Sequence, residues 1–128
     1  MNNHVQRRNE MGITYTFVEI ANPADTKIKI KEEFLVDSGA LYSVVPKNIL
    51  QRLRIKPHRK ETFILANGET IKRDIGDATF IFMGRRASSP VIFGNKGDQT
   101  LLGTVTLEAL GLFLDPLRRE LKPMPMVL

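Results

Sequence analysis

The segment Val36-Asp37-Ser38-Gly39-Ala40 places a carboxylate and a glycine directly after the apolar run Phe34-Leu35-Val36. Consecutive apolar residues predict a short strand buried on both faces, which delivers the chain to Asp37. A carboxylate leaving a buried strand is unfavourable unless neighbouring groups hydrogen-bond it. Gly39 permits a sharp bend that brings backbone N–H groups near the carboxylate, and Ser38 adds a hydroxyl. An ordinary turn is the commoner explanation of an isolated Asp-Ser-Gly, so the surrounding sequence must decide.

The sequence before this segment predicts a β-hairpin. Residues 13–18 alternate β-branched and aromatic side chains, which favours a strand. Asn22-Pro23-Ala24-Asp25 is a strong turn signal. Residues 27–31 then alternate lysine with isoleucine, which is typical of a half-buried strand returning beside the first.

The sequence after it predicts further short strands and two brief helices. Pro46 follows Val44-Val45, and we expect it at the first position of a short helix. Strand-like segments between Thr62 and Phe82 flank Asn67-Gly68, which favours a tight hairpin turn. Gly84-Arg85-Arg86 predicts another turn, before a strand over residues 91–93. A second helix is expected over 105–110, ended by Gly111. The sequence therefore predicts an all-β fold, a closed barrel or sandwich.

Length and composition limit the classes of function that the sequence supports. The 128 residues fit one domain, and no apolar run approaches the roughly 20 residues that span a bilayer. Residues 1–8 lack the apolar stretch of a secretory signal, so we expect a cytoplasmic protein without a membrane association. The absence of cysteine excludes disulfides, thiol nucleophiles and cysteine zinc sites. His4 and His58 stand alone, so no metal site is expected.

The excess of basic residues raises the possibility of a nucleic-acid-binding barrel. Lys and Arg number 19 against 14 Asp and Glu, a net charge of +5. The densest basic stretch, residues 52–60, carries no aromatic side chains for stacking on bases, and Pro57 interrupts it. A solvated helix end and loop explains it better, and nucleic acid is not an expected partner. Binding that falls steeply with salt would distinguish this alternative.

An ordered set of motifs resembles the retropepsin family of aspartic proteases. It comprises the hydrophobic strand with Asp37-Ser38-Gly39-Ala40, then Val44-Val45-Pro46, and far downstream Leu101-Leu102-Gly103 before a short helix. The resemblance extends from about Ile13 to Leu121. It implies a closed acid-protease barrel over residues 12–121, a polar N-terminal extension over 1–11, and a C-terminal tail or edge strand over 122–128.

The resemblance also implies roles for particular residues. Asp37 corresponds to the catalytic aspartate, and the active-site loop continues through Ser38, Gly39 and Ala40. The flap, a hairpin that closes over bound peptide, would turn at Ala66, Asn67 and Gly68. The stretch that supports the catalytic loop from beneath corresponds to Leu101, Leu102 and Gly103.

Hydrolysis of this type needs two carboxylates that share one proton and activate one water, as is known for aspartic proteases generally. The chain has a single Asp-Ser-Gly, and its other aspartates occur in turn-like or polar contexts: Asp25, Asp74, Asp77, Asp98 and Asp115. We therefore expect a two-fold homodimer in which each copy supplies Asp37. The expected activity is endopeptidase cleavage of a polypeptide substrate without any cofactor. The alternative is a binding or assembly module that keeps the fold without cleaving.

Overall fold

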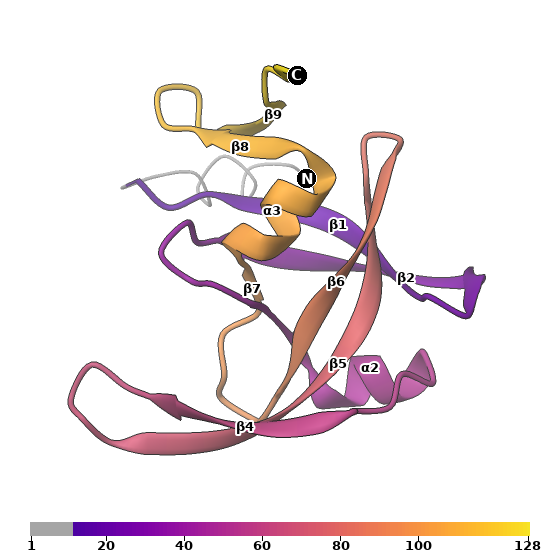
Figure 1. Ribbon diagram of the computed structural model, residues 1–128, viewed down its shortest axis with the longest axis vertical. Coiled ribbons are helices and arrows are strands. Elements are labelled where there is room, and N and C mark those ends of the chain that lie inside the picture. The colour runs from indigo at the N-terminus through magenta and orange to yellow at the C-terminus, as the bar shows by residue number, and fades with distance from the viewer. Residues whose placement is uncertain (1–11) are drawn as a thin grey trace, which may run out of the picture.

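The computed structural model describes residues 12–128, which form nine strands and two short helices (Figure 1). Residues 1–11, predicted as a polar extension, lie outside the described part. The elements in chain order are β1 (Tyr15–Asn22), β2 (Asp25–Val36), β3 (Ser43–Pro46), α2 (Lys47–Arg52), β4 (Arg59–Ile64), β5 (Thr70–Phe82), β6 (Arg85–Gly94), β7 (Leu101–Leu102), α3 (Thr104–Leu110), β8 (Leu112–Asp115) and β9 (Glu120–Pro123).

The main sheet closes on itself. Its strand order is β1-β2-β7-β3-β6-β5-β4, and β1 also pairs with β5 through Glu19↔Ile81, Ile20↔Phe80 and Ala21↔Thr79. Six strands therefore form a complete ring, and β4 pairs with β5 outside this ring. The prediction of a closed all-β fold with two short helices is confirmed.

The core fills the inside of this ring. Phe34 of β2 and Phe80 of β5 are fully buried, and their ring centroids lie 6.1 Å apart at 59°. This tilted arrangement suits the quadrupoles of two aromatic rings. Leu50 of α2 and Leu107 of α3 join the same buried cluster, so each helix contributes an apolar face to the barrel.

Three local predictions were wrong in detail. Pro46 is the last residue of β3 and caps α2 with φ −52° and ψ 136°, so the helix begins one residue later than expected. The turn after β5 is Met83-Gly84, with φ values of 51° and 76°, while Arg85 already pairs with Phe82. Two successive residues with positive φ give the twist that a two-residue hairpin requires. Finally, β4 begins at Arg59, so the basic stretch ends in a strand and not in a loop.

The C-terminal segment forms its own small hairpin. β8 and β9 pair as a separate two-stranded sheet, and Met124 donates its N–H to the Gly111 oxygen at 2.8 Å. Asp115 closes the connecting turn by accepting N–H groups from Leu117 and Arg118 at 2.9 and 3.2 Å. The region predicted as a tail or edge strand thus begins inside β9.

Across residues 12–128, neither helix has the length and apolar character needed to cross a lipid bilayer.

Candidate active site

Asp37 follows the buried end of β2, where backbone hydrogen bonds hold the chain on two sides. Val36 donates its N–H to the Thr14 oxygen at 2.8 Å. Asp37 itself donates its N–H to the oxygen of Leu102 in β7, at 3.1 Å. The position of the aspartate is therefore fixed through its backbone, which leaves the carboxylate to other partners.

The loop after Asp37 folds back on the carboxylate. Gly39 donates its N–H to Asp37 Oδ1 at 2.9 Å, and Ala40 donates to the Asp37 backbone oxygen at 3.1 Å. The Asp37 side chain is half-buried, whereas Ser38 and Gly39 are exposed. A Cβ atom on Gly39 would lie 3.2 Å from Asp37 Oδ1, so glycine allows the close approach. The predicted loop residues are thus brought together around one carboxylate.

The start of α3 lies against this loop. Thr104 and Val105 donate their N–H groups to the oxygens of Ala40 and Leu41, at 2.9 and 3.0 Å. These are orphan donors of a helix N-terminus, and here they are satisfied by the loop's carbonyl groups. The loop and helix form one hydrogen-bonded unit.

Leu101, Leu102 and Gly103, the predicted support of the catalytic loop, lie next to the Asp37 loop. Leu101 and Leu102 pair in parallel with Leu35 and Val36 of β2. A Cβ on Gly103 would lie 2.7 and 2.8 Å from backbone atoms of Tyr42 and Leu41. No side chain fits at that separation, so glycine is required for this packing.

Three buried hydroxyls form a network behind the loop, and sequence reasoning missed them. Thr106 Oγ1 lies 2.6 Å from Ser43 Oγ and 2.8 Å from Ser89 Oγ, and Ser43 Oγ accepts the Gly103 N–H at 2.9 Å. The network joins β3, β6 and α3. Small hydroxyl residues inside otherwise apolar strands and helices were the available signal.

The predicted flap is the hairpin formed by β4 and β5. Gly68 donates its N–H to the Leu65 oxygen at 2.9 Å, and Leu65 donates to the Glu69 oxygen at 2.7 Å. The tip therefore consists of Ala66, Asn67 and Gly68, with Gly68 in the left-handed conformation at φ 89°. The tip is exposed, and the hairpin extends away from the barrel at the end opposite β8 and β9 (Figure 1).

A mostly apolar cavity of about 180 Å³ lies between this hairpin and the strands beside the Asp37 loop. Phe63 and Ile71 line it from the hairpin, and Val44 and Leu101 line it from β3 and β7. Leu101 pairs with Leu35, two residues before Asp37, so the cavity lies beside the strand that leads to the aspartate loop, although none of residues 37–40 lines it. Its remaining lining residues are Arg73, Ile92, Asp98 and Gln99.

Arg73 and Asp98 form a two-pronged ion pair at this cavity. Arg73 Nε lies 2.7 Å from Asp98 Oδ2, and its Nη2 lies 3.0 Å from Oδ1. The hydrogen bonds from Arg73 hold the pKa of Asp98 below its ordinary value. The sequence suggested a solvated or turn-capping aspartate, and no local signal indicated a partner in β5.

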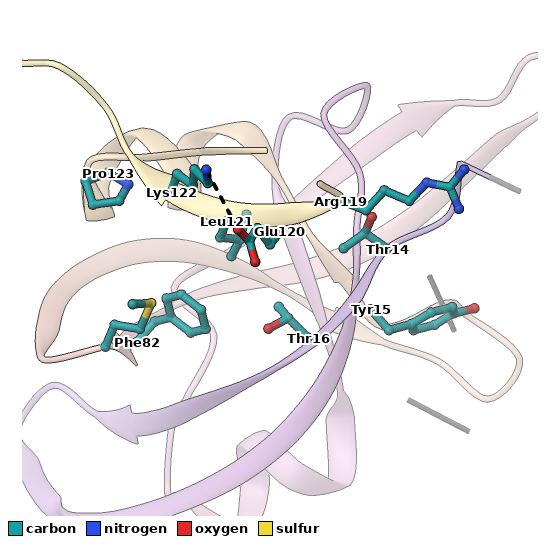
Figure 2. Close-up of a pocket in the computed structure, with 10 residues that line it drawn as sticks. Thr14, Tyr15, Thr16, Phe82, Arg119, Glu120, Leu121, Lys122 and Pro123 are labelled. Atoms are coloured by element: carbon teal, nitrogen blue, oxygen red, sulfur yellow. Dashed lines mark ion pairs between the residues drawn. The ribbon is translucent and has the colours of Figure 1, made fainter. Parts of the chain in front are cut away.

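A second cavity, of about 490 Å³, lies away from these residues. Figure 2 shows it between the start of β1, the β5–β6 turn and β9, with the Lys122–Glu120 ion pair at its rim. It contains none of the predicted site residues.

Within residues 12–128, no three His, Asp or Glu side chains are grouped in a way that could hold a metal ion.

The sequence matches no protein-family model and no curated protein. Its fold is nevertheless similar to solved structures. One is the EIAV protease in complex with the inhibitor HBY-793, with a TM-score of 0.59, 23% identity, and coverage of 94% of this chain and 97% of that one. Another is a retropepsin-like aspartic protease from Rickettsia conorii, with a TM-score of 0.54, 22% identity, and coverage of 84% and 80%. The chain therefore has a retropepsin-like fold.

Proposed function

We propose that this chain is an aspartic endopeptidase that acts as a homodimer, with Asp37 of each copy forming the catalytic pair. The observation that carries the proposal is the setting of Asp37. Its backbone is held by Leu102, and its carboxylate accepts the Gly39 N–H at 2.9 Å. This setting occurs in a fold shared with aspartic proteases.

The chemistry follows from two identical carboxyl groups brought together. Two carboxylates about 3 Å apart cannot both ionise, so the pair shares one proton. The ionised Asp37 takes a proton from the attacking water, and the protonated Asp37 of the other copy hydrogen-bonds the peptide carbonyl oxygen. Ser38 and Gly39 orient the loop, in which the Gly39 N–H binds the carboxylate and the Ala40 N–H binds the Asp37 backbone oxygen, and Leu101, Leu102 and Gly103 support it. No cofactor takes part.

The substrate in this proposal is an extended polypeptide. It lies between the hairpin tip, formed by Ala66, Asn67 and Gly68, and the floor formed by the two Asp37 loops. The cavity of about 180 Å³ has room for one apolar side chain, since a cavity of about 150 Å³ accommodates benzene. In this proposal residues 12–121 form the protease domain, and residues 122–128 form a C-terminal tail or edge strand.

Asp37→Asn tests the proposal because it removes the acid while keeping the size of the side chain. The matched control is Asp77→Asn, since the Asp77 side chain is 56% exposed and its ion-pair partner among residues 12–128 is the exposed residue His58. Purified proteins are incubated with a mixed peptide library between about pH 4 and pH 7. Mass spectrometry should detect cleavage by wild type and by the control, and a rate at least about a hundredfold lower for Asp37→Asn. Undiminished cleavage by Asp37→Asn would refute the assignment.

A mixing experiment tests whether the acid pair is shared between copies. Adding excess Asp37→Asn protein to wild type produces mixed dimers with one carboxyl. The rate per wild-type chain should then fall as the variant is added. A rate that stays constant under this titration contradicts the shared pair.

A further inference from the structure

We propose that Arg73 and Asp98 are positioning residues that couple the β4–β5 hairpin to the Asp37 loop. By holding the hairpin against the β6–β7 connection, they set the width of the apolar cavity between them. The consequence for cleavage rests on the proposed function, whereas the mechanical coupling does not.

The geometry of the pair fixes orientation as well as distance. Arg73 lies in β5, on the hairpin stem, and Asp98 lies in the connection between β6 and β7. Two parallel N–H···O contacts, of 2.7 and 3.0 Å, join the two side chains. The planar guanidinium matches a carboxylate in this mode, which a lysine cannot reproduce. The Arg73 and Asp98 side chains are only 15% and 26% exposed, so solvent screens the pair weakly.

Asp98 also restrains the connection between β6 and β7, in which it lies. Its Oδ2 also accepts the Asn95 N–H at 2.7 Å, and its own N–H bonds the Asn95 oxygen at 2.9 Å. One carboxylate thus holds both the turn and Arg73. A movement of the hairpin stem therefore acts directly on the turn.

From the turn, a short run of backbone leads to the candidate catalytic residue. Thr100 accepts the Leu35 N–H at 3.0 Å, and Leu102 accepts the Asp37 N–H at 3.1 Å. Only three residues separate Asp98 from Leu102, so a displacement of Asp98 is readily transmitted to Leu102. The hairpin and Asp37 are therefore connected through one ion pair and a two-residue strand.

The same pair forms part of the wall of the apolar cavity. Phe63 and Ile71 approach from the hairpin, and Leu101 lies opposite on β7. The backbone pairing of β5, β6, β3 and β7 also connects these two walls, but within residues 12–128 the Arg73–Asp98 pair is the side-chain ion pair that joins them directly. Without this pair, the cavity would bind a large apolar side chain of a peptide less tightly, which raises KM more than it lowers kcat.

The hairpin offers a matched control in the neighbouring ion pair. Lys60 Nζ lies 2.8 Å from Asp74 Oδ1, but this pair joins β4 to β5 within the hairpin, and Lys60 is 70% exposed. Lys60→Gln and Arg73→Gln each remove one positive charge from adjacent positions of the same hairpin. Only the second breaks the connection to the β6–β7 loop.

Hydrogen–deuterium exchange tests the coupling without reference to activity. In Arg73→Gln, amides of residues 95–102 should exchange about tenfold faster. A factor of about ten is within the range typical of energetic coupling between two sites. Lys60→Gln should leave those amides unchanged. Arg73→Lys, which keeps the charge without the planar fork, should lie between wild type and Arg73→Gln. Unaltered exchange over residues 95–102 in Arg73→Gln overturns the proposal, whether or not the protein cleaves peptides.

Kinetics on a cleaved peptide test the consequence. Arg73→Gln should raise KM about tenfold and change kcat less than about threefold, with partial recovery in Arg73→Lys. Lys60→Gln should alter neither constant. An equal effect of Lys60→Gln, or a loss confined to kcat, overturns the positioning role. Absence of cleavage by wild type would instead reject the proposed function, and the exchange experiment would still decide the coupling.

Discussion

Gly103 is the residue at which the backbone of the Asp37 loop and the start of α3 come closest. A Cβ there would lie 2.7 Å from the Tyr42 carbonyl carbon and 2.8 Å from the Leu41 oxygen. Both neighbours are backbone atoms, which cannot move aside as a flexible side chain would. The close packing of residues 41 and 42 against the start of α3 thus depends on the absence of a side chain at residue 103.

Gly103→Ala should therefore lower the free energy of unfolding by about 3 kcal/mol, since the added atom forces backbone shifts in a packed region. Gly68→Ala is the control, because no atom lies within 4 Å of its Cβ position and only its positive φ opposes the change. That conformational term amounts to about 1 kcal/mol. Urea denaturation measures both variants. Equal losses of stability would contradict the importance of the close approach.

At the residue scale, the sequence correctly predicted residues whose role is indicated by their immediate neighbours. Gly111 ends α3 in the left-handed conformation at φ 70°, and Asn67-Gly68 lies in the hairpin tip. Asp98 holds a turn, as its sequence context predicted, but its ion pair was missed because Arg73 is 25 positions away in sequence. The residues next to a side chain in the sequence do not indicate which distant residue it contacts in the fold.

At the element scale, α3 depends on the buried hydroxyls that join it to β3 and β6. Thr106 lies between Ser43 and Ser89, at 2.6 and 2.8 Å. All three residues are buried, so water cannot replace a lost partner. The helix is consequently fixed by polar contacts as well as by Leu107 and Leu110.

Thr106→Val keeps the shape of the side chain but leaves the hydroxyls of Ser43 and Ser89 without their shared partner. The expected loss in the free energy of unfolding is about 2 kcal/mol, because each buried hydroxyl loses one hydrogen bond, while Ser43 Oγ still accepts the Gly103 N–H and Ser89 Oγ still donates to the Pro90 oxygen. Thr106→Ser is the control, since it keeps the hydroxyl and loses one methyl group, at about 1 kcal/mol. Thermal and urea unfolding would measure the difference. If the valine variant proves as stable as the serine variant, the network contributes little.

Hairpins and helices could be predicted element by element, but β7 could not. The turn at Asn22-Pro23-Ala24-Asp25 and the helix before Gly111 both have strong local signals, and both occur in the structure. β7 contains only Leu101 and Leu102, and it pairs in parallel with β2. Its existence as a strand depends on distant partners, so only the resemblance to a known family indicated its position.

At the scale of the whole molecule, the pKa values of three carboxyl groups within residues 12–128 shift on folding and make stability depend on pH. Hydrogen bonds from Arg73 lower the pKa of Asp98, and backbone hydrogen bonding from Arg118 lowers that of Asp115. Burial raises the pKa of Glu32. The stabilisation from Asp98 and Asp115 is present above the ordinary Asp pKa of about 3.9 and is lost as the pH falls through their lower folded values. Glu32 acts in the opposite sense, because its ionisation in the folded state is unfavourable.

The urea midpoint should therefore fall as the pH is lowered from about 5 to about 2.5. Asp98→Asn should have a lower midpoint than wild type at pH 5, with a smaller further decrease in acid, because the variant has no charge to lose. Glu32→Gln should retain the acid-induced decrease and gain stability near neutral pH. Parallel midpoint curves for wild type and Asp98→Asn would contradict the assignment of this acid sensitivity to Asp98.

Local sequence patterns predict neither the closure of the main sheet nor the association of two chains into a dimer. Strand number and turn spacing favoured a barrel or sandwich, yet the closing contact between β1 and β5 involves only three residue pairs. Such a contact depends on the twist of the whole sheet. The homodimer stays a prediction, based on one Asp-Ser-Gly in a reaction that needs two acids.

The hydrogen bond from Asp37 to Leu102 also constrains events during translation. The ribosome releases the β1–β2 hairpin early, at about 5 to 20 residues per second, but Leu102, which anchors Asp37, is synthesised 65 positions later (102 − 37 = 65). A nascent chain that ends before Leu102 therefore carries Asp37 on a loop without this anchor. The setting of Asp37 in the folded chain can form only after Leu102 has emerged.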